Sequence, residues 1–375
     1  MDCDFTDDQE SLRDAVRRWV DKGFTFERRH ALAKAGGKSR AVYDELAELG
    51  LAGLVVPEAH GGLGQGPVDA MVVCEELGRG LVNAPFAFAA LMTPALLSAA
   101  PPALQGDWLP GIAAGETLVV PALQERAARY RLNHVSTTAR EQAGSWLLDG
   151  AKCAVPAADE ADGFIVPARV SGARDDDAGI ALFVVKTADA KVSGYATQDG
   201  GRAGDLRLSA SAAQLIAHDA LPVLEAAVDA GIAAHCAEAV GLMDRLVAIT
   251  VDYMNTRKQF GSTLGTFQAL RHRMADVKMQ LELGRSMSYF ASLKLGEAAP
   301  QRRRAISQAR VQLGQSMRAV GQQCIQLHGG IGCTDEYVAS HYFKRLTMLE
   351  MTLGDTMHHL GEVSARMQDT AGVFA

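Results

Sequence analysis

The spacing of hydrophobic residues divides the chain into three regions. In residues 1 to about 117 they recur every three or four positions, as on one face of a helix. The first such face consists of Leu12, Val16, Trp19 and Val20. Two further helices are predicted over residues 41–49, ending at Gly50, and over residues 67–79. Thr6 and Gln9 have the spacing of a capping box that would start the first helix.

The period shortens to two between about residue 118 and residue 222, which is typical of strands. Three short runs carry the pattern, at 146–152, 163–166 and 179–185. The first contains Asp149-Gly150, a dipeptide that favours a tight hairpin turn, so the chain is expected to turn back there. This region predicts a small β-barrel or sandwich.

The helical period returns in residues 223–375, where no proline occurs between Pro222 and Pro300. Glycine and proline predict breaks between long helices at Gly261, at Gly265, at residues 298–300 and at residues 329–332. These breaks indicate a bundle of four or more helices. The expected fold is therefore mainly α with a central β-domain: a helical domain (1–117), a β-domain (118–222) and a bundle (223–375).

Composition agrees with a globular protein. Of 375 residues, 48% are hydrophobic and 22% charged, which excludes a disordered chain. The 37 basic and 44 acidic residues give a net charge of −7, which disfavours nucleic acid as a partner. The six cysteines have no CxxC spacing, so neither a zinc site nor a disulfide framework is expected.

The sequence predicts neither export nor membrane insertion. Its first residues lack the basic start and apolar run of a signal peptide. The longest apolar stretch, residues 86–100, is shorter than the ~20 residues that a membrane span requires. We expect a cytoplasmic protein without a membrane span.

The first chemically informative cluster is Arg257-Lys258-Gln259-Phe260-Gly261, at a predicted helix end. An arginine beside a glycine turn can hold a phosphate with two hydrogen bonds, and Phe260 offers a ring face next to it. The structural alternative is a solvated arginine and a core phenylalanine at a helix corner.

The second cluster lies some fifty residues later and contains Gln326, Gly329 and Gly330. Paired glycines let another chain or a cofactor approach the backbone, where free N–H groups can meet phosphate oxygens. The alternative is an ordinary turn between helices. The cluster is not the GxGxxG fingerprint and follows no strand, so a Rossmann fold is disfavoured.

In combination these clusters resemble the acyl-CoA dehydrogenase family, and the resemblance spans the chain. The N-terminal half contributes Glu48-Leu49-Gly50-Leu51, Val56-Pro57-Glu58, Gly61-Gly62-Leu63-Gly64 and Glu75-Glu76-Leu77-Gly78. The central region contributes Trp146-x-Leu148-x-Gly150-x-Lys152. The C-terminal part contributes Arg257-x-Gln259-Phe260-Gly261, Phe267-Gln268, Ala275-Asp276 and Gln326-x-x-Gly329-Gly330-x-Gly332.

The resemblance implies an FAD enzyme that desaturates an acyl-CoA thioester and passes electrons to an acceptor flavoprotein. Its members are oligomers, usually tetramers, with FAD across a subunit interface. By match, Arg257, Gln259 and Phe260 would hold the pyrophosphate and adenosine side of FAD. Gln326, Gly329 and Gly330 would do so from the neighbouring subunit.

The family's reaction removes the α-proton of the thioester and therefore needs a carboxylate base. Counted without gaps from the paired glycines, the usual Glu position is Leu353. The position that some members use instead is Gly231. Neither residue can take a proton.

Three acids lie near these positions, namely Asp355, Glu350 and Asp229. Asp355 is the candidate for a displaced base, and its alternative role is that of a polar side chain at the FAD rim. Asp229 matches an Asp of several relatives. This match favours a substrate-contact or structural role for it over the role of base. Glu350 lies about one helical turn before Leu353 and is expected to face elsewhere.

The β-domain also departs from the family pattern. Only Glu125 remains of the loop that contacts flavin and substrate in the family. The family's Trp and Thr after the strand lysine are Ala154 and Pro156 here, and Pro156 has neither a hydroxyl nor an N–H to offer a flavin.

This drift resembles that of pimeloyl-CoA dehydrogenase small subunits, which share the Arg129-Tyr130 and Gly354-Asp355 pairs. In such heteromeric enzymes one subunit keeps the base and its partner has lost it. Three hypotheses stay open: a base-lacking component acting with a paralogous large subunit, a self-sufficient homomer with a displaced base, and a catalytically dead scaffold. His358 and His359 point to different faces of a helix, so no metal is expected.

Overall fold

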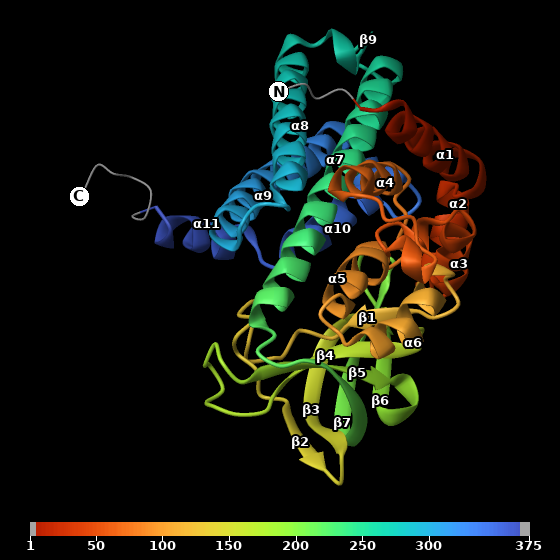
Figure 1. The fold of residues 1–375 in the computed structure, drawn as a ribbon. Coiled ribbons are helices and arrows are strands. Elements are labelled where there is room, and N and C mark those ends of the chain that lie inside the picture. The colour runs from red at the N-terminus through yellow and green to blue at the C-terminus, as the bar shows by residue number, and fades with distance from the viewer. Residues whose placement is uncertain (1–4, 368–375) are drawn as a thin grey trace. The chain divides into compact units, whose positions relative to one another are not determined.

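The computed structural model describes residues 5–367 (Figure 1). The chain forms two compact units, each assembled from separate stretches of sequence. Of the described residues, 5–30, 67–82 and 232–367 form the first, which we call the bundle unit. Residues 31–66 and 83–231 form the second, which we call the sheet unit.

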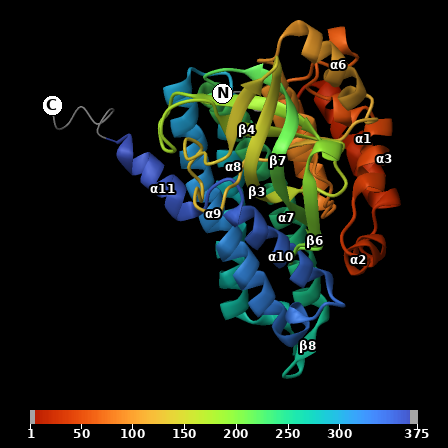
Figure 2. The same cartoon turned by 90° about the horizontal axis from the view of Figure 1, so that it is seen from below.

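The bundle unit is helical. Its helices are α1 (Asp7–Gly23), the first part of α2 (Phe26–Lys34), α4 (Pro67–Arg79), α7 (Leu221–Thr256, from residue 232 onward), α8 (Gln268–Lys294), α9 (Ala299–His328), α10 (Val338–Met351) and α11 (Thr356–Ala365). Two short strands, β8 (Lys258–Gln259) and β9 (Ser262–Thr263), follow α7. Figure 2 shows α9 and α10 side by side, with α11 continuing outward and β8 at the far end of the helices.

The N-terminal helix begins and packs as its sequence predicts. The Thr6 hydroxyl accepts from the backbone N–H of Gln9, whose side chain accepts from the backbone of Thr6, so the capping box is confirmed. The buried face of α1 includes Val16 and Val20, and α1 lies along α4. The buried carboxylate of Glu76 on α4 accepts from Arg17 of α1 at 2.6 Å, which ties the two helices together.

Two glycines allow α4 and α7 to touch backbone to backbone. A Cβ built on Gly78 of α4 would overlap the carbonyl oxygen of Glu238 on α7. A Cβ on Gly241 of α7 would overlap the carbonyl oxygen of Glu75 on α4. The two helices therefore cross at a point where neither can carry a side chain.

The sheet unit contains the seven strands of the main sheet. They are β1 (Val119–Pro121), β2 (Thr138–Gln142), β3 (Ser145–Pro156), β4 (Gly163–Arg169), β5 (Ile180–Lys186), β6 (Lys191–Ala196) and β7 (Arg202–Ala217). The path runs β1-β4-β2-β3-β7-β5, and β5 also pairs with β4, so five strands close into a barrel. β1 and β6 are attached outside that ring, on β4 and β7.

Buried apolar side chains fill the barrel. β4 is buried along its whole length, and β5 is buried except for its last residue. The α-helices that lie wholly within this unit are α3 (Arg40–Glu48), α5 (Thr93–Leu97) and α6 (Pro102–Ala113), and residues 221–231 of α7 also belong to it. The expected helix over residues 41–49 is thus present one residue earlier, followed by Gly50 at φ 79°.

The predicted hairpin turn at Asp149-Gly150 is wrong. The turn between β2 and β3 lies at Ala143 and Gly144, and β3 continues through Asp149 opposite a bulge in β7. Asp149 instead accepts a hydrogen bond from the backbone of Ala210 on β7 at 2.8 Å. Gly150 is needed for a close approach, because a Cβ there would lie 2.6 Å from the hydroxyl of Thr137.

The order of elements confirms the expected class, a mainly helical chain with a central β-barrel and a helical bundle. No helix between residues 5 and 367 combines the length and apolarity needed to cross a membrane.

Candidate functional site

The segment that follows α7 is a two-residue hairpin. β8 and β9 pair through Gln259 and Ser262, and the two turn residues between them both have positive φ, 53° at Phe260 and 79° at Gly261. This turn geometry prefers glycine or asparagine at both positions. Phe260 is therefore strained, and its side chain is also 93% exposed. A strained, exposed aromatic side chain is a candidate contact for a ligand or partner.

Arg257 is placed between α7 and this hairpin. Its backbone N–H donates to the carbonyl of Tyr253 at 2.8 Å, and its own carbonyl accepts from Leu264 at 2.9 Å. The backbone is thus fixed while the side chain is exposed. Within the described residues no carboxylate pairs with Arg257, so its guanidinium is available to an anion.

The second cluster ends α9. Gln326, Gly329 and Gly330 are all exposed. Gly329 has φ 64° and ψ −142°, a conformation that glycine alone adopts readily. A Cβ on Gly329 or Gly330 would have no other atom within 4 Å, so open space lies over the paired glycines.

Aromatic contacts bring the two clusters to one end of the bundle unit. Tyr253, one turn before Arg257, has its ring centroid 4.6 Å from that of His328, which directly precedes Gly329. Tyr337 packs against His328 at 5.1 Å. Burial lowers the pKa of His328, and its Nδ1 lies 2.8 Å from the carbonyl of Cys324. The two sequence clusters are thus joined through a common aromatic contact.

Leu353 lies in the turn between α10 and α11. Its φ is 58°, in the left-handed region that costs a residue with a Cβ roughly 1–2 kcal/mol. Arg310 of α9 is buried and donates to the carbonyls of Leu349, Thr352 (2.8 Å) and Gly354 (3.2 Å). This one guanidinium therefore holds the carbonyls on both sides of Leu353.

His359 holds the same turn from α11. Its Nε2 lies 3.2 Å from the carbonyl of Leu353 and its Nδ1 3.2 Å from the hydroxyl of Ser307. Burial and the nearby charge of Arg310 lower the pKa of His359 to about 3, so the ring is neutral at pH 7. A neutral ring can donate from Nε2 to the Leu353 carbonyl.

The acids near Leu353 are engaged in the same local structure. Asp355 is the N-cap of α11 and accepts from the backbone of His358 at 2.7 Å. Glu350 accepts from the backbone N–H and the hydroxyl of Thr356, at 3.1 and 2.7 Å. Both carboxylates thus accept hydrogen bonds from backbone N–H groups in the first turn of α11.

The second possible base position lies within α7. Gly231 is buried in this helix, and so is Asp229, which is 2% exposed. Gly231 has no carboxylate, and the carboxylate of Asp229 is not open to solvent.

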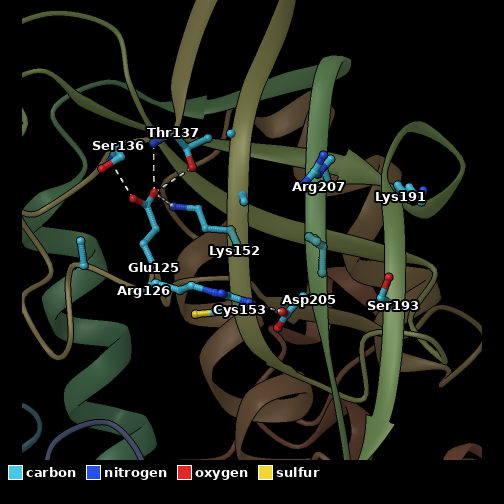
Figure 3. Close-up of a pocket in the computed structure, with 14 residues that line it drawn as sticks. Glu125, Arg126, Ser136, Thr137, Lys152, Cys153, Lys191, Ser193, Asp205 and Arg207 are labelled. Carbon is cyan, nitrogen blue, oxygen red and sulfur yellow. Dashed lines mark hydrogen bonds and ion pairs between the residues drawn. The ribbon is translucent and has the colours of Figure 1, made fainter.

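The sheet unit contains a pocket of about 710 Å³ between the loop that begins at Glu125 and strands β3, β7 and β6 (Figure 3). On its inner side lies a buried ion pair, in which Lys152 of β3 donates to Glu125 at 2.7 Å. Glu125 also accepts from the backbone of Ser136 and from the backbone and hydroxyl of Thr137. Burial alone would raise the pKa of Glu125, but the Lys152 charge and these hydrogen bonds lower it to about 2.

The sequence motifs contained Glu125 and Lys152 but did not predict their ion pair. A signal was present: Leu148, Gly150 and Lys152 alternate on one face of β3, and Leu148 is buried. A lysine on a buried face requires a carboxylate partner.

Beyond Lys152 the strand is irregular. Ala154 has φ 52° in a bulge of β3, and its backbone donates to Asp205 at 3.2 Å. Pro156 ends the strand opposite Ala203.

Among the described residues, one group of side chains has ligand atoms close enough for a metal ion. His30, Asp335 and His341 place them within 4.8 Å of one another. The Nδ1 of His341 is 2.6 Å from the guanidinium of Arg29, and Lys344 lies 3.2 Å from Asp335. Two cations at this group oppose binding of a metal ion.

Comparison with known proteins identifies the family. Residues 6–116 match the acyl-CoA dehydrogenase N-terminal domain and residues 218–368 match its C-terminal domain. The acyl-CoA dehydrogenase IpdE2 of Mycobacterium tuberculosis is 31% identical over 325 residues, covering 84% of this chain and 83% of that protein. The chain belongs to the acyl-CoA dehydrogenase family.

Two solved structures agree over nearly the whole chain. A variant of the Tcur3481–Tcur3483 steroid ACAD is 28% identical with a TM-score of 0.86, covering 97% of this chain and 99% of that one. The ChsE4–ChsE5 complex of Mycobacterium tuberculosis is 23% identical with a TM-score of 0.87, covering 99% of this chain and 100% of the other.

Proposed function

We propose that this chain is the base-lacking component of a heteromeric, FAD-dependent acyl-CoA dehydrogenase, as pimeloyl-CoA dehydrogenase small subunits are. A paralogous subunit would supply the carboxylate that removes the α-proton of the acyl-CoA substrate. Electrons would leave to an acceptor flavoprotein.

The observation that carries the proposal is Leu353. Arg310 and His359 hold the turn around this residue, yet a side chain that takes no proton occupies it. The acids nearest in sequence, Glu350 and Asp355, are hydrogen-bonded to the start of α11. A firmly held turn without a free acid supports a base supplied by another subunit.

The end of the bundle unit fits the phosphate-bearing part of FAD. Arg257 has an unpaired guanidinium at a fixed backbone position, and Gln259 and Phe260 lie beside it with exposed side chains. Gly329 and Gly330 leave open space over their backbone. When bound, FAD supplies the acceptor for the hydride that leaves the β-carbon. The role of this chain's residues is to bind the pyrophosphate and adenosine.

The names of two structural relatives agree with a partnership. The Tcur3481–Tcur3483 steroid ACAD and the ChsE4–ChsE5 complex each carry two protein names, and both share this fold over at least 97% of the chain. We propose the same kind of pairing here.

The test is to produce the chain alone and together with a paralogue that has a carboxylate at the base position. We expect acyl-CoA oxidation, followed with an artificial electron acceptor, only for the co-purified pair. Full activity of this chain alone would refute the heteromer, and Asp355→Asn would then test the displaced base.

A catalytically dead scaffold is the second candidate. The carboxylate of Glu125 is paired with Lys152, and Pro156 has no N–H to offer a flavin. Visible absorbance separates the two. A chain that stays colourless after reconstitution with FAD, alone and with its paralogue, supports the scaffold.

A further inference from the structure

Two cations face each other across strands β6 and β7. Lys191 and Arg207 are direct register partners, and both line the 710 Å³ pocket (Figure 3). Like charges directly opposite one another destabilise a strand pair. Both side chains are exposed, and within residues 5–367 neither has an ion-pair partner.

The acids that line this pocket do not neutralise the pair. Glu125 is held by Lys152, with its oxygens also hydrogen-bonded to Ser136 and Thr137. Asp205 pairs with Arg126 at 3.5 Å. The pocket lining therefore carries four cationic and two anionic side chains, and the surplus is Lys191 and Arg207.

Asp205 accepts hydrogen bonds from further donors besides Arg126. It accepts from the backbone of Ala154 at 3.2 Å and from the hydroxyl of Tyr195 at 3.3 Å. Ser193, its register partner on β6, adds a hydroxyl to the pocket lining.

We propose that this pocket binds a small ligand through a phosphate group held by Lys191 and Arg207. A phosphate monoester carries a charge of about −1.5 to −2 at pH 7, which balances two cations, whereas one carboxylate balances only one. Arginine binds phosphate through two parallel hydrogen bonds, lysine acts as a point charge, and a hydroxyl adds a donor. The volume lies in the range of small-molecule sites. The proposal does not depend on the proposed dehydrogenase function.

The test uses inorganic pyrophosphate as the probe, at constant ionic strength set with sodium chloride. Every chain in it carries Arg257→Gln, so that the site proposed for the FAD pyrophosphate does not bind the probe. We expect saturable binding in calorimetry, and an unfolding midpoint that rises with pyrophosphate concentration, as it does for any ligand of the folded state. The double variant Lys191→Gln, Arg207→Gln should lose both. Lys186→Gln, an exposed lysine of β5 outside the pocket lining, is the matched control and should keep both.

Arg207→Glu makes the test independent of folding defects. It replaces the like-charge pair by an ion pair with Lys191, so the midpoint without pyrophosphate should stay or rise while the pyrophosphate response is lost. Equal midpoint shifts in the Arg257→Gln chain and in both variants, or no saturable binding by the Arg257→Gln chain, would overturn the proposal.

Competition identifies the source of the phosphate. Displacement of pyrophosphate by coenzyme A but not by FAD assigns the site to the coenzyme A thioester, and the reverse assigns it to the flavin nucleotide. Displacement by neither supports a site for another phosphorylated metabolite.

Discussion

At the scale of single residues, Leu353 shows what the sequence predicts and what it omits. Counting from the paired glycines identified Leu353 as the usual base position, and the structure places this residue in the turn between α10 and α11. The count did not predict that Arg310, more than forty positions earlier, would hold the carbonyls on both sides of it. A contact between residues so far apart has no local pattern, because neither α9 nor the turn shows its partner in its own periodicity.

Leu353→Glu tests whether the missing base is the sole defect of this site. We expect the variant chain, reconstituted with FAD, to gain acyl-CoA oxidation on its own, because a positioned general base is worth about 10²–10⁴ in rate. Leu353→Gln has the same shape without the carboxylate and should stay inactive. Equal activity of the two variants would show that a base at 353 is not what the chain lacks.

Glu125 makes the sheet unit sensitive to acid. Its pKa is about 2 in the folded chain, below the ordinary value of 4.5, so it stabilises the fold above pH 4.5 and this contribution is lost as the pH falls from 4.5 toward 2. The contribution of Glu125 to the free energy of unfolding that is lost over this pH range is on the order of 3 kcal/mol.

The companion variants separate charge from packing. Glu125→Gln leaves Lys152 buried without its partner and should cost about 3–5 kcal/mol in the free energy of unfolding. Adding Lys152→Met should recover much of that loss and flatten the acid dependence, as measured by urea unfolding between pH 3 and pH 7. An acid dependence unchanged in the double variant would contradict the assignment.

At the scale of elements, helix ends were predicted better than strand turns. The helix over residues 67–79 is present with those bounds, because Pro67 starts it and its buried face repeats at the helical period. The turn predicted at Asp149-Gly150 is wrong because an Asp-Gly pair can also continue a strand opposite a bulge, and here the extra residue of the bulge belongs to the partner strand β7. There the Ala210 backbone bonds Asp149 and the Thr137 side chain excludes a Cβ at 150.

The crossing of α4 and α7 predicts a sharp difference between two glycines. Gly78→Ala should lower the free energy of unfolding by about 1–3 kcal/mol, because its Cβ would overlap the Glu238 carbonyl and the helices must separate. Gly361→Ala, in α11 with no atom within 4 Å of its Cβ, should raise it by about 0.5–1 kcal/mol. Thermal unfolding measures both, and equal effects would show that the crossing tolerates a methyl group.

At the scale of the whole molecule, features placed at the surface imply that the chain works in an assembly. Phe260 is exposed and its backbone is strained, and Arg257 and the two glycines that follow α9 present unpaired binding groups at the same end of the bundle unit. These are contacts made with something outside the single chain. Their residues were predictable from motifs, but the strain at Phe260 was not, since backbone angles follow from the hairpin register.

The strain at Phe260 predicts a trade between stability and binding. Phe260→Asn should raise the unfolding midpoint of the isolated chain, because asparagine tolerates positive φ, and should lower retained FAD or association with the paralogue. Ala143→Asn, at φ 51° in an equivalent exposed turn between β2 and β3, should also raise the midpoint but leave cofactor and assembly unchanged. If the two variants retain FAD and assemble equally, Phe260 has no binding role.

The way the barrel closes has a consequence for solubility. A closed ring of strands has no free edge, but β6 lies outside that ring and pairs with β7 alone. An open strand edge is a template for another copy of the chain, and a charged lysine at the edge discourages such growth. Lys191 therefore also opposes aggregation of the sheet. Lys191→Val should promote fibril formation while the fold of the single chain stays unchanged.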